Sequence, residues 1–372
     1  MNPYNPLFTP YTLNNGVAIK NRLVVAPMTH YGSNSDGTLG EAERRFIGNR
    51  AEGFGIFITA GTLVAPSGKA FEPQTAALDD SYLDSLKATA ELIQNQGAKA
   101  VLQIHHGGSQ AITADNIAPS DSDTARAATE AEIRDLIAAF ANATRLAIEA
   151  GFDGVEIHGA NGYLIQQFFS AQSNRRSDQW GGSLENRLRF PLAVIEAVHA
   201  EKTKAGRPDF IIGYRFSPEE AGDNGLTMAD TFDLIDALVT QPLQYLHVSL
   251  WDFYKKARRG ADAAKTRIEQ IHARIGGRLP LIGVGNLIRA DQVLTAYQTG
   301  WAEFIAVGKA VMLNPDFALR LQSGDTAGLE TAIDPERADR YGYTDTLWQH
   351  QIQGYTYLPP LKGHDDWQPL DI

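Results

Sequence analysis

Cysteine is absent from the 372-residue sequence. This absence excludes disulfide bonds, thiolate zinc sites, iron–sulfur clusters, a cysteine nucleophile and a cysteinyl link to a flavin. Long apolar runs are absent too, because no stretch reaches the ~20 residues that a membrane-spanning helix needs. The first residues, MNPYNPLFTPYTL, lack the basic region and apolar run of a signal peptide. We therefore expect a cytoplasmic protein.

Basic residues are in the minority, since 33 lysines and arginines stand against 44 aspartates and glutamates, a formal net charge of −11. This balance argues against broad binding to nucleic acid or to a membrane surface. An anionic ligand must then be held by a few local donors. With 43% hydrophobic and 21% charged residues, the composition is typical of a globular protein with a large core. We expect neither nucleic acid nor a membrane among its partners.

Short apolar runs alternate regularly with helical patterns along the chain. Helical patterns cover 80–98, 129–151 and 183–206, and the second begins with Thr129 and Glu132, a capping-box pair. Between such patterns, near-continuous apolar runs rich in β-branched residues predict eight strands, over 22–28, 55–64, 99–106, 154–159, 210–217, 245–250, 279–285 and 304–310. Eight strand-then-helix units predict an α/β protein with a (β/α)₈ TIM barrel.

The two ends of the chain carry separate signals. Asn14, Asn15 and Gly16 lie between two short runs and predict a β-hairpin that closes the bottom of the barrel. The segment from about 340 to 372 is rich in aromatic residues. We expect this tail to pack on its own barrel or on a neighbouring subunit, so a homo-oligomer stays open. No repeat or linker divides the chain, which predicts one domain over 1–372.

Polar residues interrupt the strand in GVEIHGANGYLIQQFF, residues 154–169. Side chains alternate along a strand, so Val155 and Ile157 face the helices while Glu156 and His158 point into the barrel. Burying such polar groups without partners costs roughly 1–3 kcal/mol each. A ligand or an internal hydrogen-bond network is therefore expected, and for Glu156 alone the internal network is favoured.

Other strand ends carry residues suited to a ligand, because the carboxyl ends of barrel strands line the active site. Arg215 lies in an apolar strand and needs compensation for its charge. Glycines after the last two strands can bring a phosphate to backbone N–H groups. His105 and His106 are adjacent on a strand and point to opposite sides, so no metal site is predicted.

The run HGANGYLIQQFFSAQSNRRSDQWGGSLENRLRFPL, residues 158–192, resembles the signature of the Old Yellow Enzyme family of flavin-dependent oxidoreductases. NRLVVAPM, LQIHHGG and GYRFSPEE stand where that family has its other motifs, so the resemblance covers roughly the whole chain. It implies one FMN-binding TIM-barrel domain with NADH or NADPH as electron donor. The implied ene-reductase activity transfers hydride from reduced flavin to the β-carbon of an electron-poor alkene such as an α,β-unsaturated carbonyl compound. Quinones and nitro compounds are further acceptors.

The resemblance also implies roles for individual residues. His158 and Asn161 would grip an oxygen of the substrate, Tyr163 would deliver a proton, and Tyr31 would line the substrate site. Lys309 stands where many members of the family have arginine, a bidentate donor. Trp251, Phe253 and Tyr254, after the sixth predicted strand, would either line the mouth of the site or serve in packing. The residues that would hold non-covalent FMN are Pro27, Met28, Thr29, Ala60, Gln103, His158, Arg215, Gly285, Asn286, Gly308 and Lys309.

Two other functions stay open at this point. One is a lyase or isomerase that binds a phosphate-bearing ligand in the same kind of barrel. The other is a non-catalytic protein that binds flavin. The sequence leaves the physiological substrate and the choice between NADH and NADPH undetermined.

Overall fold

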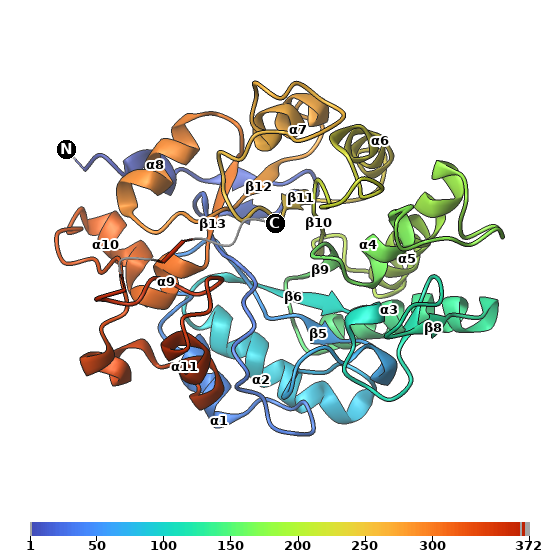
Figure 1. The fold of residues 1–372 in the computed structure, drawn as a ribbon. Coiled ribbons are helices and arrows are strands. Elements are labelled where there is room, and N and C mark those ends of the chain that lie inside the picture. Colours follow the sequence, from blue (N-terminus) through green and yellow to red (C-terminus); the bar gives the residue numbers. More distant parts are fainter. Residues whose placement is uncertain (1, 365–366, 369–372) are drawn as a thin grey trace.

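Eight parallel strands close a barrel in the computed structural model, which describes residues 2–364 and 367–368 (Figure 1). The last strand pairs with the first, and β4 pairs with β6, so the ring has no free edge. The predicted (β/α)₈ TIM barrel is confirmed. Its strands are β3 (Leu23–Val25), β4 (Ile56–Ile58), β6 (Lys99–His105), β9 (Gly154–Gly159), β10 (Ile211–Phe216), β11 (Tyr245–Val248), β12 (Leu281–Gly283) and β13 (Phe304–Val307).

The run predicted as one strand over 55–64 is two strands, β4 and β5 (Thr62–Leu63). Ile58 pairs with Val101, whereas Thr62 pairs with Ile104, so four residues on one side match three on the other. Such an extra residue is a bulge, which bends a strand and redirects its side chains. The bulge places Gly61 at the wall of the cavity described below.

Helices surround the barrel on its outer side (Figure 1). The capping box expected at Thr129 is present, because Glu132 N donates to the Thr129 hydroxyl at 3.2 Å and Thr129 N donates to the Glu132 carboxylate at 2.8 Å. Such a cap stabilises a helix by roughly 1 kcal/mol. The surrounding helices are α1 (Glu41–Ile47), α2 (Leu83–Gln94), α3 (Glu130–Glu149), α5 (Leu184–Lys204), α6 (Met228–Leu238), α7 (Arg267–Ile275), α8 (Ala290–Gln298), α9 (Lys309–Leu313) and α10 (Phe317–Ser323).

The apolar core has two layers. Val155 and Ile157 belong to the layer between barrel and helices, as their alternation predicts. Leu13 and Ile19 join inward-facing strand residues such as Val101 in the second layer, inside the barrel. Leu13 and Ile19 come from the segment of β1 (Tyr11–Thr12) and β2 (Ala18–Ile19), an antiparallel pair. The hairpin therefore closes the barrel floor, as expected.

The last described segment packs on the barrel of its own chain. Leu347 of α11 (Asp345–Ile352) lies in one buried cluster with Phe46 of α1 and Met312 of α9. Figure 1 shows α11 beside α1. Within residues 2–364 and 367–368, none of the helices combines the length and the apolar character needed to cross a membrane.

Shorter elements lie mainly in the loops. They are α4 (Leu164–Phe169), β7 (Ile117–Ala118), β8 (Arg126–Ala127) and the 3₁₀ helices η1 (Asn5–Phe8), η2 (Pro66–Gly68), η3 (Asp80–Tyr82), η4 (Gly108–Gln110) and η5 (Pro335–Tyr341).

Candidate functional site

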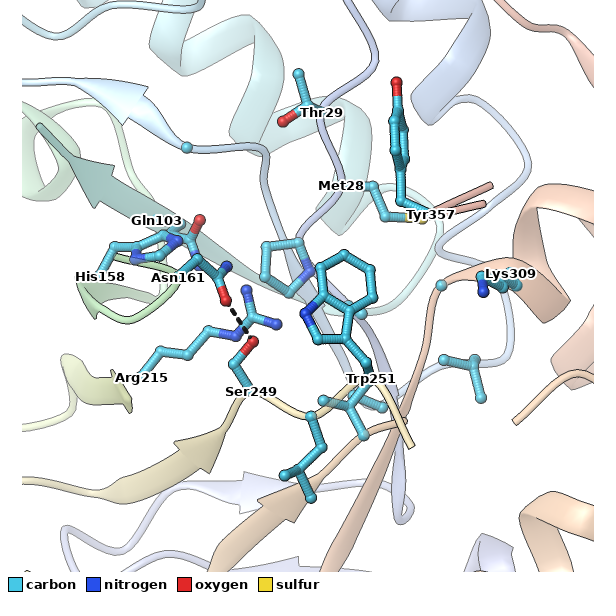
Figure 2. Close-up of a pocket in the computed structure, with 18 of the residues that line it drawn as sticks. Met28, Thr29, Gln103, His158, Asn161, Arg215, Ser249, Trp251, Lys309 and Tyr357 are labelled. Atoms are coloured by element: carbon cyan, nitrogen blue, oxygen red, sulfur yellow. Dashed lines mark hydrogen bonds between the residues drawn. The ribbon is translucent and has the colours of Figure 1, made fainter. Parts of the chain in front are cut away.

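The carboxyl ends of the barrel strands surround a cavity of about 460 Å³ (Figure 2). This volume lies within the ~300–1,000 Å³ that small-molecule sites usually have. Ala60 and Gly285 do not line the cavity, although their neighbours Gly61, Val284 and Asn286 do. Every other residue expected to hold FMN or the substrate lines it: Pro27, Met28, Thr29, Tyr31, Gln103, His158, Asn161, Tyr163, Arg215, Asn286, Gly308 and Lys309.

Gly285 lies against backbone rather than the cavity. Its carbonyl oxygen accepts a hydrogen bond from Phe253 N at 3.1 Å, and a Cβ added to Gly285 would lie 2.3 Å from that nitrogen. The glycine therefore permits a close approach between two loops. Phe253 is fully buried and Tyr254 is 40% exposed, so of the three aromatic residues expected at the mouth only Trp251 lines the cavity.

His158 is a neutral hydrogen-bond donor at the end of β9. Its Nδ1 accepts a hydrogen bond from Ala160 N at 3.2 Å. Burial lowers the pKa of His158 well below its ordinary value, with nearby His105 and Arg215 adding to the effect. A neutral imidazole that accepts at Nδ1 carries its proton at Nε2. His158 Nε2 is therefore an N–H donor in the cavity wall.

Asn161 offers two further donors. Its backbone N donates to the Ser217 hydroxyl at 2.8 Å, and its side-chain oxygen accepts from the Ser249 hydroxyl at 2.7 Å (Figure 2). With the amide oxygen occupied, the Nδ2 group faces the cavity with both N–H bonds, and the described residues supply no acceptor for them. His158 and Asn161 thus present donors to one ligand.

Tyr163 stands beside this pair and is a protonated phenol. Burial raises the pKa of Tyr163 to about 12, with a further contribution from Tyr31. Its ring packs edge-on against His105 at 4.4 Å between centroids and against Phe71 at 6.2 Å. The phenol therefore keeps its proton at neutral pH and can give it to a basic atom in the cavity.

Backbone strain collects around the cavity. Tyr31, Asn161 and Asn286 have φ values of 54°, 58° and 50°, in the left-handed region. Asparagine tolerates this conformation, but a tyrosine there costs roughly 1–3 kcal/mol. All three residues line the cavity. Residues held this way cluster at functional sites, where the surrounding structure maintains them.

Glu156 lies beneath the cavity in the internal network that its sequence context favoured. Its carboxylate is fully buried and accepts hydrogen bonds from Gln103 Nε2 at 2.7 Å, Tyr245 OH at 3.1 Å and His247 Nδ1 at 2.9 Å. Burial lowers the pKa of His247 although Glu156 acts to raise it, so the imidazole donates as a neutral group.

Arg215 is the buried cation next to this network. Burial lowers the pKa of its guanidinium while the charge of Glu156 raises it. Among the described residues, Arg215 Nε has no hydrogen-bond partner. A buried donor left unpaired costs roughly 1–3 kcal/mol. The arrangement is suited to a ligand that brings an acceptor or negative charge to Arg215.

Lys309 is the cation at the other end of the cavity, across from His158 and Arg215 (Figure 2). Its Nζ donates to the Asn286 side-chain oxygen at 3.0 Å and to Thr356 O at 3.4 Å, and it lies 4.6 Å from the centre of the Trp367 ring. Burial lowers the pKa of Lys309 to about 8. A ligand phosphate at this end would meet a charged ammonium near neutral pH.

Several lining residues were not predicted from the sequence. Ser249 directly follows β11, so the rule that the carboxyl ends of barrel strands line the active site could have found it. His105 was considered only as a metal ligand, yet it lines the cavity. Phe71, Tyr357 and Leu358 come from a loop and from the carboxyl-terminal segment, where no periodic pattern indicates which way a side chain points.

Comparisons with known proteins give a consistent result. The model of the NADH:flavin oxidoreductase / NADH oxidase family matches residues 6–327. The probable NADH-dependent flavin oxidoreductase YqiG of Bacillus subtilis (strain 168) is 46% identical over 370 residues, which cover 96% of this chain and 99% of that protein. The NADH:fumarate oxidoreductase of Klebsiella pneumoniae (strain 342) is 36% identical over 93% of this chain but only 39% of its own length.

Solved structures show the same likeness. The Old Yellow Enzyme homologue from Zymomonas mobilis superposes with a TM-score of 0.76 at 25% identity, over 91% of this chain and 96% of that one.

Proposed function

Since the chain belongs to the NADH:flavin oxidoreductase / NADH oxidase family, which it shares with Old Yellow Enzyme homologues, we propose that it is an ene-reductase for neutral alkenes conjugated to a carbonyl group. The protein is an NAD(P)H-dependent flavin oxidoreductase with FMN as cofactor. The narrower proposal rests on one observation, the pair of fixed N–H donors on His158 and Asn161.

The residues of the cavity fit FMN. Arg215 is a buried cation with an unpaired Nε, which suits an electron-rich edge of the isoalloxazine ring. One N–H of the Gln103 amide donates to Glu156, so its carbonyl oxygen points away from that carboxylate and is left to accept from the ring. Lys309, beside Asn286 and Gly308, would hold the phosphate. Pro27, Met28 and Thr29 would contact the ring from the end of β3. Bound FMN supplies the hydride that reaches the β-carbon of the substrate.

His158 and Asn161 would activate the substrate through its carbonyl oxygen. Two converging N–H donors draw electron density toward that oxygen and make the β-carbon electrophilic. Because neither side chain is charged, both can donate without a change in protonation. The Ser249 hydroxyl holds the Asn161 amide in the donating orientation.

Tyr163 would complete the reduction by giving a proton to the α-carbon. Its pKa of about 12 keeps the phenol protonated in the resting enzyme. The ring contacts with His105 and Phe71 fix its direction. A positioned proton donor contributes typically 10²–10⁴-fold to a rate.

Charge in the cavity favours a neutral substrate over a dicarboxylate. Among the described lining residues, the cationic side chains are Arg215 and Lys309, both assigned above to the cofactor. The cavity is also lined by uncharged aromatic rings, those of Tyr31, Phe71, Tyr163 and Tyr357. A relative is named for fumarate, but this chain spans 39% of that protein. We propose cyclic or aryl-substituted enones and enals, reduced in the cytoplasm, with quinones as further acceptors.

The two functions left open by the sequence receive less support. Relatives of this chain are named as NADH- or NADPH-oxidising enzymes, which favours turnover over non-catalytic flavin binding. A lyase or isomerase would need a lysine or an acid–base pair at the site. His158 is neutral and Tyr163 is a weak acid, while the lysine present, Lys309, already donates to Asn286 and Thr356.

An anaerobic product assay tests the proposal. The purified protein would be incubated with NADH or NADPH and 2-cyclohexen-1-one, and then with fumarate in its place. We expect cyclohexanone in a 1:1 ratio to oxidised nicotinamide, and little reduction of fumarate. Oxidation of nicotinamide with a quinone but with neither alkene would contradict ene-reduction and leave the family activity in place.

A further inference from the structure

The buried carboxylate of Glu156 interacts with two residues that line the cavity. It accepts a hydrogen bond from Gln103, and it is stabilised by the charge of Arg215. We propose that Glu156 is a positioning residue that fixes the amide of Gln103, and that its charge lowers the reduction potential of the flavin by offsetting the charge of Arg215. The inference rests on the placement of FMN against these two residues proposed above.

The orientation of Gln103 follows from its hydrogen bonds. Its Nε2 donates to Glu156 Oε1 at 2.7 Å, and its backbone N donates to the Thr59 hydroxyl at 3.0 Å. The side chain is only 2% exposed, so it has little room to turn. A carboxylate accepts hydrogen bonds but donates none, so the amide cannot reverse without placing two oxygens against each other. Glu156 therefore directs the Gln103 carbonyl oxygen to the ligand.

The charge balance under the cavity depends on the same carboxylate. Burial disfavours the charged form of Glu156, but His247, Arg215 and Gln103 together hold the pKa of the carboxyl below its ordinary value, so it is ionised. His247 and Tyr245 donate as neutral groups. Glu156 and Arg215 thus form a pair with no net charge, in a region where water screens little.

This balance bears on the energy of the reduced flavin. Two-electron reduction places negative charge at one edge of the isoalloxazine ring, and a nearby cation stabilises that charge. Arg215 acts in this direction, whereas Glu156 opposes it. The carboxylate therefore keeps the flavin a stronger hydride donor than Arg215 alone would allow. A potential tuned this way suits transfer to an alkene carbon.

The test is the flavin midpoint potential of a Glu156→Gln variant, measured by equilibration with a reference dye. Glutamine has the same shape and can still accept from Gln103. Tyr245 can turn its hydroxyl, and neutral His247 can move its proton to Nε2, so that both accept from the new amide. The variant loses the charge and keeps the packing. We expect the flavin equilibrium to shift at least tenfold toward the reduced form, a rise of about 30 mV for a two-electron couple.

Two further variants separate charge from structure. Glu156→Asp keeps the charge but moves the carboxylate away from Gln103. The equilibrium between oxidised and reduced flavin should therefore stay within threefold of that in the wild type, while FMN binds less tightly. Glu43→Gln is the matched control, because Glu43 is also a buried glutamate, paired with His30 Nε2 at 3.3 Å but outside the cavity lining. The flavin midpoint potential of Glu43→Gln should equal that of the wild type.

A wild-type potential in Glu156→Gln, or an equal rise in Glu43→Gln, would overturn the inference. If Glu156→Gln does not fold, a tenfold shift in Glu156→Asp would overturn it instead. Failure of the proposed function looks different, since the wild-type protein itself would then fail to bind FMN or to reduce cyclohexenone.

Discussion

The Ser249 hydroxyl donates to the side-chain oxygen of Asn161 at 2.7 Å, across 88 positions of sequence. This contact joins the loops after β9 and β11 and decides which end of the Asn161 amide meets a ligand. Without it, the oxygen and nitrogen of the amide could exchange places. The hydrogen bond therefore supports the oxygen grip that we assign to His158 and Asn161.

Binding of phenolic ligands can test the donors on His158 and Asn161, because a bound phenolate gives a long-wavelength charge-transfer band with oxidised flavin. Ser249→Ala should weaken phenol binding by ~5-fold, the worth of one hydrogen bond near 1 kcal/mol. Replacing both His158 and Asn161 by alanine should abolish the band and the ene-reduction while FMN stays bound. Loss of one such donor costs ~10²–10³ in rate. Ser173→Ala, at a serine outside the cavity lining, is the control for Ser249→Ala. If the double alanine variant reduced alkenes at the wild-type rate, these roles of His158 and Asn161 would be refuted.

Tyr163→Phe should separate the two halves of the catalytic cycle. Flavin reduction by NAD(P)H needs no proton from the phenol and should stay near the wild-type rate. Alkene reduction should slow by roughly 10²–10⁴-fold, the contribution of a positioned proton donor. Reduction of quinones, which needs no proton on carbon, should be spared. Stopped-flow measurement of each half-reaction checks this, with Tyr254→Phe, 40% exposed, as the control. Equal slowing of every step would assign Tyr163 to packing alone.

The barrel could be predicted because it depends on local patterns, and about half of the cavity lining could be named from strand ends and from the resemblance to a known family. Strand periodicity places Glu156 and His158 inward, and the strand-end rule gathers Arg215 and Lys309 around one space. The rest depends on contacts between distant segments. Tyr357 reaches the cavity only because α11 packs against α1, and no local pattern encodes that packing. The bulge after β4 was missed for a similar reason, since it is defined by the register with β6.

Gly285 has a second reason to lack a side chain, which the motif did not indicate. A glycine after the seventh predicted strand was expected to admit a phosphate, and the structure shows that the residue also accommodates the backbone of Phe253. Both situations need a residue without Cβ, so the sequence alone cannot distinguish them. Its neighbour Asn286 lines the cavity and contacts Lys309.

Lys309 should make FMN affinity depend on pH. Its pKa of about 8 in the protein without ligand means that the ammonium is charged below this pH and neutral above it. A phosphate binds the charged form better, so the FMN dissociation constant should rise as pH increases from 7 to 10. Lys309→Arg, which stays charged over this range, should give a flatter profile. Quenching of FMN fluorescence measures both. A wild-type profile as flat as that of the arginine variant would contradict the assignment.

The carboxyl-terminal segment should contribute to stability as part of the core. Leu347 is fully buried against Phe46 and Met312, so Leu347→Ala should lower the free energy of unfolding by roughly 2–5 kcal/mol. Ile352 lies on the same helix and is 43% exposed, so Ile352→Ala should lower the free energy of unfolding far less. Denaturant unfolding of both variants makes the comparison. Equal stability would show that α11 adds little to the core.

The central claim is most directly tested by a single turnover of the wild-type enzyme. The protein would be reduced with one equivalent of NADH without oxygen and then mixed with 2-cyclohexen-1-one in a stopped-flow spectrophotometer. We predict that the absorbance of oxidised flavin returns as one equivalent of cyclohexanone forms. Flavin that stays reduced with the enone but is reoxidised by a quinone would contradict the account.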